Sequence, residues 1–182
     1  MRTVPVLLCL SVLSISEIFP QSLDLSRTTF SASGEWLIPH REFGEFWNSG
    51  PGLGVRAETP LSPTLFLIGN GRFSWFQRAE SVRKGKIPHI LLITLGLGLQ
   101  SQARIFPDLL FSADLSLANN TFVFLGLAAP DDIDNAVESE FGFQGSVQIR
   151  SPGIGFFISY QHIFAGLDPV AVTSLGVFIP LQ

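Results

Sequence analysis

Two neighbouring segments of this chain alternate residue by residue between apolar and polar side chains, and a turn containing two prolines joins them. One face carries Leu53, Val55, Ala57, Leu65, Leu67, Phe73 and Trp75, and the other carries Gly54, Arg56, Glu58, Asn70, Arg72 and Ser74. A period of two residues predicts β-strands, because successive side chains of a strand point to opposite faces. The apolar face points inward in a water-soluble sheet, but in a membrane barrel it points outward to lipid and the polar face lines the lumen. The orientation of this face therefore decides what kind of protein the chain can form.

The same alternation recurs along the chain and predicts eight strands. Besides the two strands within residues 52–75, we expect strands at residues 28–38, 87–100, 108–118, 139–150, 153–162 and 170–181. Long connections are expected at 39–51, 77–86, 119–138 and 163–169, and short ones at 60–64, 101–107 and 151–152. Connections that alternate between long and short are typical of outer-membrane barrels, which have long outer loops and short periplasmic turns.

The composition favours the membrane orientation. The mean hydropathy is +0.38 and only 14% of the residues are charged. After the N-terminus, however, the chain has no run of about 18 uncharged apolar residues that would form a spanning helix. Unpaired backbone groups are not tolerated in lipid, so strands that cross a membrane must close on themselves. The predicted fold is therefore all-β: an eight-stranded antiparallel up-and-down transmembrane β-barrel.

The N-terminus has the pattern of a secretory signal. Arg2 supplies the positive charge, residues 4–13 form a short apolar core, and Ser14 and Ser16 fit a small-x-small cleavage site, although cleavage near Gln21 is an alternative. We expect a signal peptide with a short N-terminal segment at 1–22 and a barrel domain at 23–182. Cys9, the one cysteine, lies in the signal, so the mature barrel is expected to contain no disulfide. No basic stripe supports nucleic-acid binding.

Several longer motifs resemble those of a known family. The stretch G-E-W-L-I-P-H-R-E-F-G-E-F-W-N-S-G-P-G-L-G-V-R-A-E-T-P-L-S-P, residues 34–63, resembles the opening of the bacterial outer-membrane β-barrel domain family. The segments I-P-H-I-L-L-I-T-L-G-L-G-L and Y-Q-H-I-F…L-G-V-F-I-P-L are similar to later strands of that family. The resemblance is to small eight-stranded barrels of the OmpX/OmpW-like type. It implies export to a Gram-negative outer membrane, with the barrel-insertion machinery and outer-membrane lipid as partners.

The predicted lumen face carries a balanced set of charges: Glu35, Arg56, Glu58, Arg72, Asp114 and Arg150. An eight-stranded barrel encloses just enough room for side chains to fill it. Three acids and three bases can pair there and close the lumen. The alternative is a narrow ion path that these residues line.

Two sets of residues are expected at the outer membrane interface. Aromatic residues near the ends of strands that lead into long loops predict an aromatic girdle: Trp36, Trp47, Trp75 and Phe76. A basic loop predicts contact with lipopolysaccharide phosphates, through Arg78, Arg83, Lys84 and Lys86. Alternatively, the aromatic residues form a cluster over a soluble sheet and the basic residues only aid solubility.

Neither catalysis nor metal binding is expected. Ser159 and His162 are three residues apart on a predicted strand, with Asp168 nearby, so they point to opposite faces and cannot hydrogen-bond. No G-x-S-x-G motif is present. The acidic residues Asp131, Asp132, Asp134, Glu138 and Glu140 are expected in a solvated loop, since the loop lacks the glycine-centred turn of a calcium site. No cofactor is predicted.

The sequence therefore predicts a non-enzymatic outer-membrane barrel with a structural or surface-interaction role, a plugged lumen and a monomeric state. A narrow pore or carrier for small solutes is one alternative. A second is a periplasmic lipocalin-like barrel that holds an apolar ligand, which requires the leucine and phenylalanine side chains to face inward.

Overall fold

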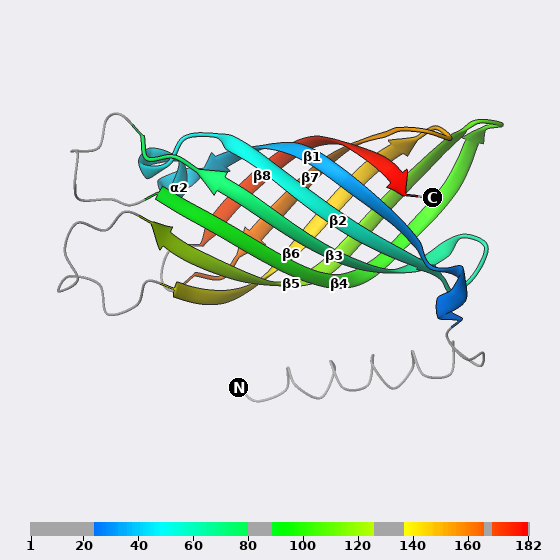
Figure 1. Ribbon diagram of the computed structural model, residues 1–182, viewed down its shortest axis with the longest axis horizontal. Coiled ribbons are helices and arrows are strands. Elements are labelled where there is room, and N and C mark those ends of the chain that lie inside the picture. The colour runs from blue at the N-terminus through cyan, green and yellow to red at the C-terminus, as the bar shows by residue number, and fades with distance from the viewer. Residues whose placement is uncertain (1–23, 80–88, 126–136, 166–168, 182) are drawn as a thin grey trace, which may run out of the picture.

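The computed structural model describes residues 24–79, 89–125, 137–165 and 169–181. Eight antiparallel strands form a closed barrel in which each strand pairs with its neighbours in the chain and β1 pairs with β8 (Figure 1). The strands are β1 (Thr29–His40), β2 (Gly50–Pro60), β3 (Leu65–Phe76), β4 (His89–Phe106), β5 (Leu109–Leu125), β6 (Val137–Arg150), β7 (Gly155–Ile163) and β8 (Val170–Leu181). The predicted all-β barrel fold is confirmed.

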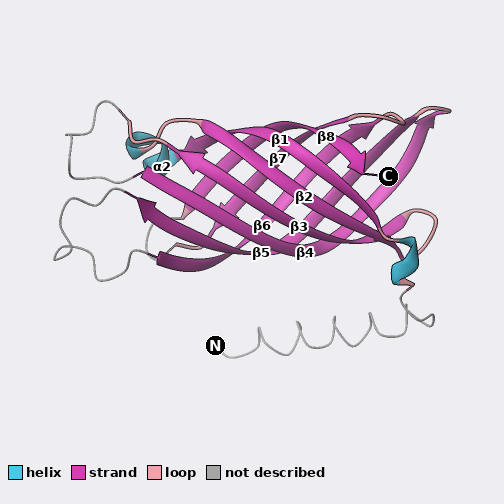
Figure 2. Cartoon of the chain, viewed as in Figure 1, coloured by secondary structure: helices cyan, strands magenta, loops and turns pink. Residues whose placement is uncertain are grey.

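Two short helices lie at opposite ends of the barrel (Figure 2). The 3-10 helix η1 (Leu25–Arg27) precedes β1, and the α-helix α2 (Arg41–Phe46) follows it. Asp24 caps η1: its carboxylate accepts hydrogen bonds from the Ser26 hydroxyl and backbone N–H, and these bonds lower the pKa of Asp24. Among the described residues, no helix is long and apolar enough to cross a membrane.

Several predicted boundaries are wrong. The connection expected at 101–107 is paired strand, because Ser101, Gln102 and Ala103 continue the β4 ladder against β5. The turn is only Pro107 and Asp108, and a bulge between Arg104 and Phe106 precedes it.

The connection expected at 119–138 is also shorter, since β5 continues to Leu125 and β6 begins at Val137. Glu138 and Glu140 therefore lie on β6 instead of in a loop, while Asp131, Asp132 and Asp134 lie outside the described residues. In the connection expected at 39–51, the structure contains α2, which the alternation did not predict.

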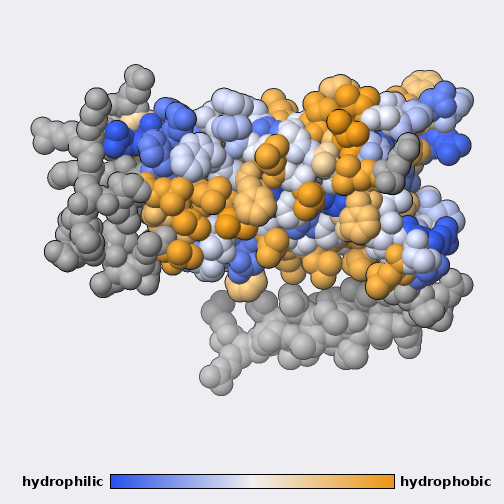
Figure 3. All heavy atoms as spheres, viewed as in Figure 1, coloured by the Kyte–Doolittle hydropathy of each residue, from blue (hydrophilic) through white to orange (hydrophobic). Residues whose placement is uncertain are grey.

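The alternating faces are oriented as the membrane fold requires. Leu53 is 69% exposed, Leu97 62% and Leu117 75%, whereas Glu58 is 3% and Arg72 5% exposed. Apolar residues gather over the side of the barrel (Figure 3). The lipocalin-like alternative required these leucines to face inward, so the structure excludes it.

Placing a charged side chain on this outer face tests whether the face points to lipid. Leu97 lies in the middle of β4, opposite Gly69 of β3 and Leu117 of β5. We expect Leu97→Arg to lower the free energy of unfolding in lipid vesicles by about 2 to 3 kcal/mol, because an arginine near the bilayer midplane loses its hydration. Urea titration followed by tryptophan fluorescence measures the change. As a control, Ala103→Arg, placed beyond the apolar band near the turn end of β4, should change it by less than about 1 kcal/mol.

Candidate functional site

The lumen near the short turns contains an ion-paired group, here called the turn-side ion cluster: Arg56, Glu58, Asp114 and Arg150. Both carboxylate oxygens of Glu58 accept hydrogen bonds from Arg150 Nη2, at 2.7 Å each, and Glu58 Oε1 also accepts one from Arg56 Nε at 3.0 Å. Arg56 Nη2 lies 2.9 Å from Asp114 Oδ2. Strands β2, β5 and β6 contribute these side chains, so the cluster crosses the barrel interior.

A second polar group, the central polar cluster, surrounds Arg72 and consists of Glu35, Arg72, Ser159, Gln161 and Ser174. Arg72 Nη1 lies 3.2 Å from Glu35 Oε2 and donates to the hydroxyls of Ser159 and Ser174 at 3.4 Å. Arg72 Nη2 donates to Gln161. The structure thus brings all six predicted lumen charges into the barrel interior and pairs each acid with at least one arginine.

The lumen near the long connections is apolar, which the sequence analysis missed. The loop-side apolar cluster consists of Leu37, Phe43, Phe76, Ile90, Leu92, Phe122, Ile163 and Val172, each at most 7% exposed. The strand residues of this cluster lie at the alternate positions that face the lumen. Continuing the alternation from the lumen-facing Thr94 back to Ile90 would therefore have predicted part of the cluster. Phe43 comes instead from α2, and its ring packs on Phe76 at 5.3 Å and on Phe122 at 6.3 Å between centroids.

Hydrogen bonds between the chain after α2 and the chain after β3 hold α2 over the barrel mouth. Asn48 N donates to Gln77 O and Ala79 N donates to Phe46 O, both at 2.8 Å. Trp47 and Arg78 form a β-bridge between these segments. Arg41, with a φ of 56°, adopts the left-handed conformation that is uncommon for a residue with a side chain, and it turns the chain sharply from β1 into α2.

The predicted aromatic girdle is only partly on the outer face. Trp36 is 52% exposed there, and Trp75 stacks on His89 with centroids 5.8 Å apart. Trp47 packs against the loop-side apolar cluster. Phe76 is fully buried inside the barrel, so its predicted interface position is wrong. It follows Trp75 directly and therefore points to the opposite face.

The other predicted residues are placed as follows. Arg78 follows β3, and its backbone N–H donates to His89 Nδ1 at 3.4 Å, whereas Arg83, Lys84 and Lys86 lie outside the described residues. The barrel wall separates Ser159, which bonds Ser174 in the lumen, from His162, which stacks on the outward Phe143; Asp168 lies outside the described residues. Within the part of the chain that the structure describes, no three His, Cys, Asp or Glu side chains cluster as metal ligands.

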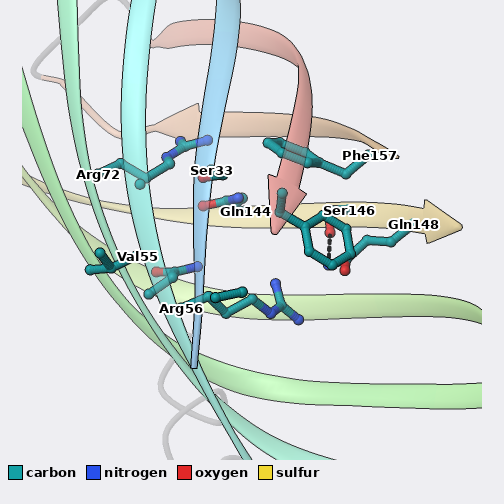
Figure 4. Close-up of a pocket in the computed structure, with 12 residues that line it drawn as sticks. Ser33, Val55, Arg56, Arg72, Gln144, Ser146, Gln148 and Phe157 are labelled. Carbon is teal, nitrogen blue, oxygen red and sulfur yellow. Dashed lines mark hydrogen bonds between the residues drawn. The ribbon is translucent and has the colours of Figure 1, made fainter. Parts of the chain in front are cut away.

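A small cavity separates the two polar clusters (Figure 4). Its volume is about 40 Å³, and the side chains of Arg56, Arg72, Gln144, Phe157 and Phe178 contribute to its wall. Such a volume holds only a few water molecules. Among the described residues, Asn70 Oδ1, Arg72 Nε and Gln144 Oε1 are buried without a hydrogen-bond partner, so the wall has polar atoms that water can satisfy. The guanidinium of Arg150 lies over the Phe178 ring, 5.1 Å from its centroid, at the turn end.

These features define a class of protein: a small β-barrel of the transmembrane type, with an apolar outer wall and paired charges inside the lumen. No family model matches the sequence, and no curated protein sequence matches it.

Solved structures of bacterial outer-membrane proteins are similar to this one. The outer membrane protein OprG of Pseudomonas aeruginosa has a TM-score of 0.62 at 12% identity, covering 85% of this chain and 95% of OprG. Neisserial surface protein A has a TM-score of 0.59 at 12% identity, covering 84% and 96%. The Yersinia pestis outer membrane protein Ail, in a phospholipid bilayer nanodisc, has a TM-score of 0.52 at 12% identity, covering 84% and 99%. The chain therefore has the fold of the small eight-stranded outer-membrane barrels.

Proposed function

We propose that this protein is a non-enzymatic barrel of a bacterial outer membrane whose closed lumen serves as a rigid core. In this proposal the protein has either a structural role in the membrane or a surface-interaction role, in which the loop end of the barrel contacts other molecules. The observation that carries this proposal is the filling of the lumen by the two polar clusters and the loop-side apolar cluster, with Phe43 over the mouth.

The proposed location rests on two observations. The fold is shared with bacterial outer-membrane proteins, and the N-terminus has the pattern of an export signal. The proposed partners are outer-membrane lipid, lipopolysaccharide and the barrel-insertion machinery, and the proposed oligomeric state is a monomer. Arg78, Arg83, Lys84 and Lys86 are the proposed contacts for lipopolysaccharide phosphates, because cations near a membrane surface attract anionic headgroups.

Conductance across planar bilayers tests the closed lumen. We expect the wild-type protein to insert without producing conductance steps, since the ion-paired clusters cross the lumen and the cavity between them is only about 40 Å³. Insertion is checked separately by the shift in electrophoretic mobility on boiling in SDS. A wide porin reconstituted in the same bilayers serves as the conducting control. Defined conductance steps from the wild-type protein would contradict the proposal and favour the pore or carrier.

A further inference from the structure

The outward residues of β7, β8 and β1 are arranged in rows by the strand pairing. His162, Ala171 and His40 form one row, followed by Tyr160, Thr173 and Ile38, then Ile158, Leu175 and Trp36, then Phe156, Val177 and Gly34. The rows change from imidazole, phenol and hydroxyl groups at the loop end to apolar groups below. Two of the three histidines of the chain share the first row.

The first row lies at the expected edge of the hydrocarbon. Phe30 and His40 are the lowest and highest outward residues of β1. At about 3.3 Å per residue and a tilt of about 40°, the ten residue steps from Phe30 to His40 span about 25 Å along the membrane normal, the height of the apolar band in such barrels. His40 and His162 therefore lie where the apolar band meets the headgroups.

The histidine side chains of this row are held in place by their neighbours. His40 Nε2 lies 2.7 Å from Thr173 Oγ1. His162 stacks on Phe143 with centroids 5.2 Å apart and contacts Phe164 edge to face at 5.1 Å. Between the histidines, Ala171 has a short side chain that is 1% exposed. Since neighbouring strands are about 4.8 Å apart, the two histidine Cα atoms are about 10 Å apart, on either side of the covered Ala171.

On the outer face, the strands of this row carry hydrogen-bond donors and no acid. The row itself contains no acid, and β8 contains no titratable residue; β7 contributes only Tyr160 besides His162. On β6, Glu138 and Glu140 have the lumen-facing parity. The helix α2 brings Arg41 directly after His40 but also contains Glu42 and Glu45.

A groove lies on the same strands below this row. It is shallow and open to the surroundings, and its wall includes Gly34, Trp36, Phe156, Leu175 and Val177. A Cβ added at Gly34 would meet nothing within 4 Å, so the glycine leaves the groove open. The groove is apolar and, in a membrane barrel, faces lipid. An acyl chain therefore has the chemistry and the location to fill it.

We propose that the His40–Ala171–His162 row, with Thr173 and Arg41, binds the phosphate of an outer-leaflet lipid whose acyl chain lies in the groove at Gly34. Imidazole N–H, hydroxyl and guanidinium groups are all hydrogen-bond donors to phosphate oxygens, and the guanidinium adds a positive charge. The inference rests on the proposed membrane location and adds to it a defined lipid site on one wall of the barrel.

Quenching of tryptophan fluorescence tests this site. The probe is phosphatidylglycerol with a nitroxide on its acyl chain, and the reference is diacylglycerol with the same nitroxide, each in phosphatidylcholine vesicles. The test protein carries Trp47→Phe and Trp75→Phe, so Trp36 is its one remaining tryptophan. We expect the site to prefer the phosphatidylglycerol probe over the diacylglycerol probe by about fivefold. One charge interaction near a membrane surface is worth about 1 kcal/mol, which corresponds to this factor.

Variants assign the effect to the site. His40→Gln with His162→Gln should abolish the preference, and Gly34→Leu should reduce quenching by both probes by filling the groove. His89→Gln, on the opposite wall, should leave the preference unchanged. Equal quenching by both probes in the inserted wild-type protein would overturn the inference. Loss of the preference on adding inorganic phosphate would assign the site to free phosphate instead. Absence of quenching by either lipid would contradict the proposed membrane location itself.

Discussion

Replacing Glu58 with glutamine is expected to lower the free energy of unfolding by about 3 kcal/mol, the cost of leaving buried charges without their partner. Glu58 is 3% exposed, and its carboxylate accepts hydrogen bonds from both Arg56 and Arg150. Glutamine keeps the shape of the side chain but removes its charge. Arg56 keeps Asp114, 2.9 Å away, whereas Arg150 loses its only ion-pair partner among the described residues. Urea titration of the protein in lipid vesicles measures the loss.

Two further variants separate the ion pairing from a general effect of removing an acid. Glu42→Gln, on the exposed side of α2, should change the stability by less than about 0.5 kcal/mol. Combining Glu58→Gln with Arg150→Met should recover part of the loss, because it removes the unpaired charge. A loss for Glu58→Gln no larger than that for Glu42→Gln would show that the turn-side ion cluster contributes little.

Replacing Phe43 with alanine is expected to destabilise the barrel by about 3 kcal/mol, because a buried phenylalanine leaves a cavity that its neighbours fill only in part. Phe43 is 7% exposed and contacts Phe76, Phe122 and Trp47 within the loop-side apolar cluster. The polar clusters below remain intact in this variant. We therefore expect a lower unfolding midpoint in urea but still no conductance.

Phe46→Ala is the matched control for Phe43. Phe46 lies on the same helix but is 39% exposed, and its bond to Ala79 uses its backbone carbonyl, which alanine keeps. The expected change is within about 1 kcal/mol. If the two variants lost the same stability, the helix as a whole, and not the inserted ring, would be what stabilises the barrel mouth.

The strands and their faces followed from the sequence because both depend on local alternation. Leu53 and Glu58 differ in parity, and parity alone assigns one to lipid and the other to the lumen. The strand ends did not follow, since Ser101 and Gln102 have polar side chains typical of turns although they pair with Ala113 and Ser112 of β5. Where a strand continues past the apolar band, its residues no longer alternate between apolar and polar, so the hydropathy pattern does not reveal where the strand ends.

The contents of the lumen were predicted only in part. The charged residues were identified from their parity, but which arginine meets which acid depends on the stagger of strands around the closed barrel, as for Arg72 of β3 and Glu35 of β1. Predicting the loop-side apolar cluster required two further observations. Ile90 and Leu92 lie on a strand that is apolar on both faces, and Phe43 comes from a helix in a connection without any period.

The orientation of the barrel wall is the central claim, and spin labels on single cysteines test it most directly. In lipid vesicles, nitroxides at Leu115→Cys and Leu117→Cys should collide often with oxygen and rarely with a water-soluble nickel chelate, because both side chains face the hydrocarbon. A nitroxide at Ser62→Cys, in the exposed turn between β2 and β3, should show the reverse. Cys9→Ser removes the native cysteine from every variant. Equal, high access of the nickel chelate to positions 115, 117 and 62 would contradict the transmembrane barrel.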